Sequence, residues 1–487
     1  MKILQEIIYK VPLLAVKGNT SIEIRQIQFD SRKIQQNDVF VAIKGEKSDG
    51  HEFIESVSEK GILAVVCEIL PQNLKEGITY LQVRNSSEAL AIMACNFYDR
   101  PSEKLKLVGI TGTNGKTTTV TLLHALFMRL GYHVGLLSTI QHQIGNQVFS
   151  ASHTTPDALT INELLKKIVD AGCTHAFMEV SSHALVQHRV TGLDFDGAIF
   201  SNLTHDHLDY HQTFEAYRDA KKLFFDRLNS KSFALVNRDD KNGEIMLQNC
   251  KAKKHFYGIK SMADFKAKIV SNSPQGIELE IGHQQIWFQL IGEFNAYNLL
   301  TVYASAVLLG EDSLEILAAL SALNPVKGRF ERIMSKQNIL AIVDYSHTPD
   351  SLQNVLKTID HFRTRNEQVI TVVGCGGNRD ASKRPMMADI ACKYSNKVIL
   401  TSDNPRFEEP EQIIEQMQKG VQPIDFKKTM QIVDRAQAIQ KACEIANSGD
   451  IILIAGKGHE DYQEIKGEKH HFDDREMVEK MFALLDK

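Results

Sequence analysis

The segment from Leu105 to Thr119, LKLVGITGTNGKTTT, constrains the fold more than any other part of the chain. An apolar run suited to a buried parallel strand leads into a glycine loop, after which apolar residues recur at helical spacing. Glycines let backbone N–H groups surround phosphate oxygens, and the start of the helix adds its positive end. Lys116 would reach the β- and γ-phosphates of ATP, and the Thr117 hydroxyl would reach Mg²⁺.

This loop departs by one position from the general P-loop pattern. Ile110 stands where that pattern has its first glycine, so the alternative interpretation is a glycine-rich turn between strand and helix. The GKT sequence directly before a helix favours phosphate binding instead. The predicted ATP-binding residues of the loop are Gly112, Thr113, Asn114, Gly115, Lys116, Thr117 and Thr118.

Length and composition limit the class of protein. A chain of 487 residues is too long for one core and predicts about three domains. Its net charge of −4 gives no general attraction to nucleic acid or anionic membrane. Seven scattered cysteines without CxxC spacing favour a reducing cytoplasm, and no run approaches the ~18 apolar residues of a membrane span. We expect a cytoplasmic protein without nucleic-acid partners or membrane insertion.

The chain divides into three parts by its pattern of strands and helices. Residues 1–100 alternate short strand-like runs with polar turns, which predicts a small α/β domain. Residues 101–332 carry the glycine loop and further apolar strands, which predicts a central ATP-binding domain on a parallel sheet. Residues 333–487 alternate strands and helices in a doubly wound, Rossmann-like pattern. The expected fold class is therefore α/β with three domains.

Three polar clusters follow predicted strands of the central domain, and open α/β sheets bind ligands at such carboxyl ends. The first cluster, residues 153–156, could equally be the cap of the next helix. In the second, an apolar strand delivers Glu179 opposite the phosphate loop, where a Mg²⁺ ligand is needed. The third, FSNLTHDHLDYH, spans residues 200–211. Several histidines occur in these clusters, but no HxxxH or CxxC frame supports a zinc site.

Four strands of the C-terminal part end in the polar loops DYSHTPD, GCGGNRD, SDNPRFEEP and GKGHEDYQ. The glycines of the second loop do not form GxGxxG, because Arg379 occupies the third glycine position, so dinucleotide binding is not predicted. Arginine, aspartate, asparagine and glutamate at one sheet edge indicate a zwitterionic small-molecule ligand.

Nine motifs between residues 30 and 475 resemble, in order, those of the Mur ligases: TGTNGKTT, MEVSSHALVQHR, SNLTHDHLDYH, GEFNAYNLL, KGRFE, DYSHTPD, GCGGNRD, DNPR and GKGHEDY. The resemblance implies a UDP-binding N-terminal domain, a central ATPase domain and a C-terminal domain for the incoming amino acid. It also implies a monomeric, ATP- and Mg²⁺-dependent ligase that adds the third residue of the peptidoglycan stem peptide. The acceptor would be UDP-N-acetylmuramoyl-L-alanyl-D-glutamate, activated as an acyl phosphate.

The resemblance further implies roles for residues at matching motif positions. Ser31 would contact the uridine nucleotide. The rest of the UDP-muramoyl dipeptide would be held by Thr154, Thr155, Ser181, Gln187 and Arg189. Mg²⁺ would be bound by Thr117, Glu179 and His207, and ATP also by Asn298, Arg329, Asp344 and His347. Lys221 would be carbamylated, which converts a cation into an oxygen-bearing anion beside Mg²⁺, and the catalytic set would be Lys116, Lys221, Glu179 and His207. From spacing alone, Lys221 and Lys222 are expected to be solvated.

The segment Asp403-Asn404-Pro405-Arg406 concerns the choice of amino acid. Meso-diaminopimelate carries a distal carboxylate that lysine lacks, and Arg406 on a loop rigidified by Pro405 offers a planar fork for it. Lysine would leave this arginine unpaired, at a cost of ~3 kcal/mol or more. The resemblance also favours meso-diaminopimelate, because Mur ligases with DNPR use it. The predicted contacts are Arg379, Asp403, Asn404, Pro405, Arg406, Gly456 and Glu460.

The sequence also fits other roles for Arg406 and other functions for the whole chain. Arg406 could instead lie on an exposed turn and pair with Glu408 or Glu409. The chain could be a lysine-adding Mur ligase, or a ligase like folylpolyglutamate synthase, which would lack the N-terminal domain and the DNPR loop. A protein of a different class, a nucleotide-sensing switch, would show no amino-acid-dependent turnover.

Overall fold

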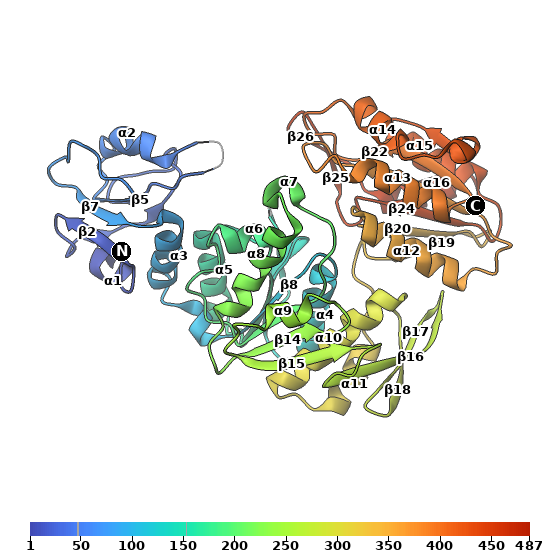
Figure 1. Ribbon diagram of the computed structural model, residues 1–487, viewed down its shortest axis with the longest axis horizontal. Coiled ribbons are helices and arrows are strands. Elements are labelled where there is room, and N and C mark those ends of the chain that lie inside the picture. Colours follow the sequence, from blue (N-terminus) through green and yellow to red (C-terminus); the bar gives the residue numbers. More distant parts are fainter. Residues whose placement is uncertain (46–47, 152) are drawn as a thin grey trace.

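The computed structural model describes residues 1–45, 48–151 and 153–487. The chain forms three α/β units that follow one another in sequence, each built on its own sheet (Figure 1). The first and third units lie on either side of the middle unit. Parallel strand pairs dominate all three sheets, which confirms the predicted α/β fold class.

The first unit holds a five-stranded sheet and short helices. Its elements are β1 (Lys2–Ile3), α1 (Leu4–Ile7), β2 (Leu13–Lys17), β3 (Glu23–Ile24), β4 (Ile27–Gln28), β5 (Val39–Val41), α2 (Ile54–Ser58), β6 (Ala64–Cys67), β7 (Thr79–Val83) and α3 (Ser86–Phe97). The strand order is β2-β7-β6-β5-β4. Asn85 caps α3 by accepting the N–H of Glu88 at 2.9 Å. The core of this unit includes Ala158 and Leu159 of the middle unit, which anchors the two units to each other.

The middle unit holds an eleven-stranded sheet with helices on both faces. Its elements up to the centre of the chain are β8 (Lys106–Thr111), α4 (Lys116–Arg129), β9 (Val134–Leu137), β10 (Gln141–Ile144), β11 (Gln147–Ser150), α5 (Ala158–Asp170), β12 (His175–Glu179), α6 (Ser182–Val186), β13 (Gly197–Phe200), α7 (Leu208–His211) and α8 (Phe214–Asp226). β8 lies between β12 and β13 and is parallel to both. The carboxyl ends of these three strands therefore meet at one edge, as the polar clusters predicted.

The second half of the middle unit extends this sheet. Its elements are β14 (Phe233–Asn237), α9 (Gly243–Met246), β15 (Lys253–Gly258), β16 (Phe265–Ser273), β17 (Gly276–Ile281), β18 (Gln284–Phe288), α10 (Glu293–Leu309) and α11 (Ser313–Ser321). Helices α4, α10 and α11 pack on one face of the sheet, and α5, α6 and α8 pack on the other. The antiparallel extension β16-β17-β18 was not predicted, although buried and less buried residues alternate along β17 with the period of a strand.

The third unit is doubly wound. Its elements are β19 (Glu331–Met334), β20 (Leu340–Asp344), α12 (Pro349–Phe362), β21 (Val369–Cys375), α13 (Lys383–Tyr394), β22 (Lys397–Ser402), α14 (Pro410–Gln418), β23 (Thr429–Gln431), α15 (Arg435–Ile445), β24 (Ile451–Ala455), β25 (Tyr462–Ile465), β26 (Glu468–His471) and α16 (Asp474–Leu484). The sheet order is β19-β20-β24-β21-β22-β23, with β19 antiparallel at one edge. Helices α12 to α14 cover one face, and α15 and α16 cover the other.

Two further features bear on the expectations from sequence. The seven cysteines are buried free thiols. Within the described part of the chain, no helix combines the length and apolar character that a bilayer crossing requires.

Candidate active site

A cavity of about 900 Å³ lies between the middle and third units, at the carboxyl ends of their central strands. It brings together predicted phosphate-binding and amino-acid-binding residues that lie far apart in sequence, from Thr113 to Glu460. The predicted residues that line it are Thr113, Asn114, Gly115, Lys116, Thr117, Thr118, Thr154, Glu179, His207, Asn298, Arg329, Asp344, His347, Arg379, Asp403, Asn404, Arg406, Gly456 and Glu460.

The glycine loop forms a tight connection between β8 and α4. Gly115 has a φ of 87°, and a Cβ atom there would lie 2.6 Å from Oδ1 of Asn298, so the position requires glycine. Lys116 Nζ donates to the carbonyls of Gly112 at 2.9 Å and Thr113 at 2.8 Å. Burial lowers the pKa of the Lys116 ammonium, against the attraction of Glu179 and Asp206. The loop therefore forms a compact cationic nest of the kind that binds phosphate.

Two hydrogen bonds join this loop to later parts of the chain. Arg329 Nη2 donates to Thr117 Oγ1 at 3.1 Å, and the guanidinium lies 4.5 Å from the ring centroid of Tyr345. Asn114 Nδ2 donates to Asp350 Oδ2 at 2.8 Å, at the start of α12. These contacts bring the third unit onto the phosphate loop of the middle unit.

Asp344 and His347 lie at the end of β20, on the third-unit side of the cavity. Asp344 Oδ2 accepts the N–H of Phe330 at 2.7 Å, and burial raises the pKa of this carboxyl. His347 Nδ1 lies 2.9 Å from the carbonyl oxygen of Tyr345, and burial lowers the pKa of the imidazole to about 4. The His347 ring is therefore neutral at pH 7 and can donate or accept a hydrogen bond to a ligand.

Glu179 and His207, which the resemblance assigns to Mg²⁺, both line the cavity. The Glu179 side chain is buried and its Oε1 accepts the N–H of Thr139 at 2.8 Å, while Oε2 has no hydrogen-bond partner among the described residues. A buried carboxylate oxygen without a partner is costly, and a cation would satisfy it. Burial lowers the pKa of His207, against the attraction of Asp206, so its imidazole is neutral and able to coordinate.

The described residues contain no group of three or more histidine, cysteine, aspartate or glutamate side chains placed to hold a metal. Mg²⁺ differs from zinc in this respect, because it commonly takes one or two protein ligands and keeps several waters. Glu179, His207 and the Thr117 hydroxyl therefore fit Mg²⁺ better than they fit a metal that needs a full protein cage.

Lys221 and Lys222 are both buried, so the expectation that they are solvated is wrong. Lys221 Nζ donates to the carbonyl of Gly112 at 2.8 Å, the same carbonyl that Lys116 contacts, and lies 4.5 Å from the ring centroid of Tyr217. Burial and the neighbouring Lys116 lower the pKa of Lys221 well below its ordinary value. Lys222 instead pairs with Asp226 at 2.6 and 2.8 Å.

The residues predicted to hold the UDP-muramoyl dipeptide lie in two separate regions, one beside Glu179 in the middle unit and the other in the first unit. Arg189 donates to the carbonyl of Thr155 at 2.7 Å and to Oε1 of Gln187 at 2.6 Å. Thr155 Oγ1 donates to the carbonyl of Glu179 and accepts the N–H of Ser181, so these residues form one cluster beside Glu179. Ser31 lies in the first unit, in the turn after β4, and the cavity is not lined by it within the described residues.

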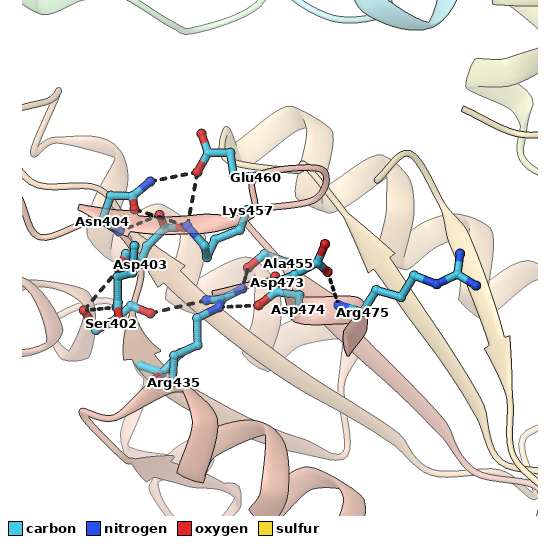
Figure 2. A network of polar contacts seen from close by, with 12 residues as sticks. Ser402, Asp403, Asn404, Arg435, Ala455, Lys457, Glu460, Asp473, Asp474 and Arg475 are labelled. Carbon is cyan, nitrogen blue, oxygen red and sulfur yellow. Dashed lines mark hydrogen bonds and ion pairs between the residues drawn. The ribbon is translucent and has the colours of Figure 1, made fainter. Parts of the chain in front are cut away.

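The amino-acid side of the cavity is built from the loops after β22 and β24 (Figure 2). Asn404 Nδ2 donates to Oε2 of Glu460 at 2.7 Å, which ties the two loops together. Gly456 has a φ of 120°, and a Cβ atom there would lie 2.5 Å from Oδ2 of Asp403. Arg379 lines the same region from an exposed position after β21.

Arg406 has partners that the sequence did not indicate. Its Nε lies 3.3 Å from Oε2 of Glu464 in β25, and its Nη1 donates to the carbonyl of Gly377 at 2.8 Å. The predicted alternative pairing with Glu408 is wrong, because Glu408 accepts two hydrogen bonds from Arg384. The expectation that Arg406 lacks a partner without a substrate carboxylate is wrong as well.

Sequence reasoning missed several charged residues of the site. Asp206 and Asp350 line the cavity, and they lie within the motifs SNLTHDHLDYH and DYSHTPD, respectively. Arg435 and Lys457 are fully buried cations near the amino-acid loops. Lys457 lies in the GKGHE motif, which was a signal, whereas nothing in the sequence distinguishes Arg435.

Comparison with known proteins identifies the family. A model of the Mur ligase middle domain matches residues 110–306, a model of the Mur ligase glutamate ligase domain matches residues 328–458, and a model of the Mur ligase family catalytic domain matches residues 23–98. The UDP-N-acetylmuramoyl-L-alanyl-D-glutamate–2,6-diaminopimelate ligase of Cytophaga hutchinsonii is 57% identical over 485 residues, which cover 99% of this chain and 100% of that protein.

Solved structures agree with this assignment. One of a UDP-N-acetylmuramoyl-L-alanyl-D-glutamate–2,6-diaminopimelate ligase is 32% identical, with a TM-score of 0.69 over 100% of this chain and 99% of that chain. The MurF ligase of Thermotoga maritima, solved in complex with ADP, shares the fold at 20% identity and a TM-score of 0.62 over 94% of this chain and 97% of that chain. The chain belongs to the Mur ligase family.

Proposed function

We propose that this chain is the ATP-dependent ligase that joins meso-2,6-diaminopimelate to UDP-N-acetylmuramoyl-L-alanyl-D-glutamate in peptidoglycan precursor synthesis. The γ-carboxylate of D-glutamate attacks the γ-phosphate of ATP, and ADP leaves. The amine of diaminopimelate then attacks the acyl phosphate, and phosphate leaves. The observation that carries this proposal is that the phosphate loop and the loops bearing Asp403, Arg406 and Glu460 open into one cavity. The name of the relative from Cytophaga hutchinsonii supports it.

The phosphate side of the cavity would bind ATP and oppose the repulsion between two negative reactants. Backbone N–H groups at the start of α4 and the Lys116 ammonium would neutralise phosphate charge and fix the line of attack. The rest of the nucleotide would be contacted by Asn298, Arg329, Asp344 and His347, which all line the cavity. Mg²⁺, held by Thr117, Glu179 and His207, would supply further charge neutralisation on the phosphate oxygens when bound.

Lys221 would act as its carbamate. Because the pKa of Lys221 is lowered, its amine is neutral in a larger fraction of the molecules. A neutral amine adds CO₂ to form N–COO⁻ and releases a proton. The product is an anion beside the Gly112 carbonyl, where the unmodified side chain places its Nζ. Its oxygens would help to hold Mg²⁺ near the γ-phosphate.

The two remaining substrates would bind on either side of the phosphate loop. Ser31 would contact the uridine nucleotide, and the cluster of Thr154, Thr155, Ser181, Gln187 and Arg189 would hold the muramoyl dipeptide. Asp403, Asn404, Gly456 and Glu460 would receive the ammonium groups of diaminopimelate, and Arg379 and Arg406 its distal carboxylate, with Pro405 stiffening the loop. Rates for alanine variants at these positions, measured with each substrate limiting in turn, test this division.

We further propose functional domains at residues 1–100, 101–332 and 333–487, and a cytoplasmic monomer. Light scattering tests the oligomeric state, and cell fractionation tests the location. Limited proteolysis tests the two boundaries, because chain between domains is cut faster than chain within them. A dimer, or cleavage first within a sheet, would contradict these statements.

A phosphate-release assay tests the function itself. ATP and the UDP-muramoyl dipeptide are supplied with an amino-acid panel, and release should depend on meso-diaminopimelate. A preference for lysine would make the chain a lysine-adding ligase, and a requirement for folate would indicate a folylpolyglutamate synthase. Nucleotide binding without amino-acid-dependent turnover would indicate a switch.

A further inference from the structure

A fully buried lysine lies behind the amino-acid side of the cavity. Lys457 lies in the loop after β24, separated from the strand by Gly456, and its side chain has no exposed surface. Among the described residues it does not line the cavity, whereas its neighbours Gly456 and Glu460 do. Figure 2 shows its ammonium pointing between Asn404 and Glu460. The proposed reaction uses no group at this position, so its contacts call for a separate explanation.

The Lys457 ammonium has three donors, and the structure supplies three acceptors. It donates to Oδ1 of Asn404 at 3.1 Å, to Oε2 of Glu460 at 3.3 Å and to the carbonyl of Tyr462. An ammonium can only donate, so it specifies that an oxygen, not a nitrogen, of the Asn404 amide faces it. All three donors of Lys457 are therefore used by hydrogen bonds to Asn404 and Glu460, which line the cavity, and to Tyr462 at the start of β25.

The contact with Lys457 fixes the orientation of the Asn404 side-chain amide. Its Oδ1 accepts from Lys457 and also from the N–H of Glu464 at 2.9 Å. Its Nδ2 must then face the other way, where it donates to Oε2 of Glu460 at 2.7 Å. Glu460 Oε2 thus receives two donors, while Oε1 has the Tyr345 hydroxyl at 3.5 Å. One carboxylate oxygen of Glu460, a residue that lines the cavity, is therefore held by two donors, and the other has only the long contact from the Tyr345 hydroxyl.

Lys457 also supplies the positive charge that two neighbouring carboxylates need. Burial raises the pKa of Glu460, and Asp403 raises it further, while Lys457 opposes both effects. The pKa of Asp403 is lowered even though it is buried, because Lys457, Arg435 and Arg406 outweigh the burial. Without Lys457 the pKa of both carboxyls would rise, because each would lose a nearby positive charge, and a protonated carboxyl is a poorer acceptor for an ammonium group.

We propose that Lys457 is a positioning residue for the incoming amino acid: through Asn404 it orients Glu460, and Oε1 of Glu460 is left to receive a substrate ammonium group. This inference rests on the proposed function and goes beyond it, because the proposed function gives Lys457 no role and the described cavity lining does not include it. Its action is indirect and passes through two residues that line the cavity.

The test compares three variants, Lys457→Met, Glu460→Gln and the double variant, in the full-length protein with saturating ATP and UDP-muramoyl dipeptide. Phosphate release is measured against the concentration of meso-diaminopimelate. Lys428→Met is the matched control, because Lys428 contacts the carbonyl of Cys392 and Asp425 away from the cavity.

We expect Lys457→Met to raise KM for diaminopimelate by roughly tenfold or more and to leave KM for ATP within about twofold of wild type. Lys428→Met should change neither value. Because Lys457 acts through Glu460, the double variant should have the same KM as Glu460→Gln within about threefold. An unchanged KM in Lys457→Met, or losses that multiply in the double variant, would overturn the inference.

Loss of a buried cation could unfold Lys457→Met. The double variant removes one positive and one negative charge together, so the comparison with Glu460→Gln then decides the question alone. If the wild-type protein shows no amino-acid-dependent phosphate release, the proposed function itself is wrong. This result can be told apart from a failure of the Lys457 inference, which concerns only the variants.

Discussion

Arg406→Met tests how the site chooses its amino acid. Methionine keeps an unbranched apolar stem and removes the guanidinium donors. In this structure the guanidinium is held by Glu464 and the carbonyl of Gly377, and the side chain is 20% exposed. These contacts leave the remaining donors to meet a distal carboxylate from the cavity side.

The expected magnitude follows from those contacts. A charge-assisted hydrogen bond contributes about 1.5–3 kcal/mol, so the diaminopimelate carboxylate should favour this substrate over lysine by roughly 10- to 150-fold. A larger penalty would require Arg406 to lose every partner when lysine binds. Glu464 and Gly377 remain in place, so the structure lowers the estimate made from the sequence alone.

The assay measures kcat/KM for meso-diaminopimelate and for L-lysine with wild type, Arg406→Met and the control Arg363→Met. Arg363 pairs with Asp360 and contacts Asn396, and it is absent from the described cavity lining. The ratio of the two kcat/KM values should fall to within a fewfold of unity in Arg406→Met and stay at the wild-type value in the control. Wild-type selectivity in Arg406→Met would refute the role of Arg406.

Three further predictions concern the lysine beside the phosphate loop, the buried ion pair of the third unit and the buried histidines. Lys221→Ala should abolish most ligase activity while Lys222→Ala keeps it, and equal losses in phosphate release would contradict the carbamate. Asp474→Asn leaves the fully buried Arg435 without its anion and should lower the free energy of unfolding, measured in urea, by about 3–5 kcal/mol. A decrease below about 1 kcal/mol would show that the Arg435–Asp474 pair is not buried in solution. Burial lowers the pKa values of His124 and His175 to about 4, so their stabilisation is complete above the ordinary value of 6.5 and is lost as the pH falls toward 4. The free energy of unfolding should therefore drop by about 1–2 kcal/mol per histidine between pH 7 and 5, and a flat profile would contradict this.

The parallel strands and their polar ends could be predicted from sequence because both depend on local patterns. The apolar runs before Gly112, Glu179 and Asp403 are continuous, as burial on both faces of a parallel sheet requires. The edge at which such strands end follows from the topology, so the meeting of these loops at one cavity could be expected.

Contacts between side chains from distant segments could not be predicted in this way. Lys221 lies on a helix whose spacing says nothing about the Gly112 carbonyl, which is 109 positions earlier in the chain. Arg406 pairs with Glu464 because β25 lies beside the loop after β22. No local sequence pattern indicates that this strand and this loop are neighbours. The separation of Ser31 from the cavity likewise depends on how whole units pack together.

Product analysis shows which amino acid the protein joins to the UDP-muramoyl dipeptide. The purified protein is incubated with ATP, UDP-N-acetylmuramoyl-L-alanyl-D-glutamate and an equimolar mixture of meso-diaminopimelate and L-lysine, and the nucleotide product is identified by mass spectrometry. We expect a UDP-muramoyl tripeptide that contains diaminopimelate, with one ADP and one phosphate formed for each amide bond. A lysine-containing product, or ATP hydrolysis without any tripeptide, would contradict it.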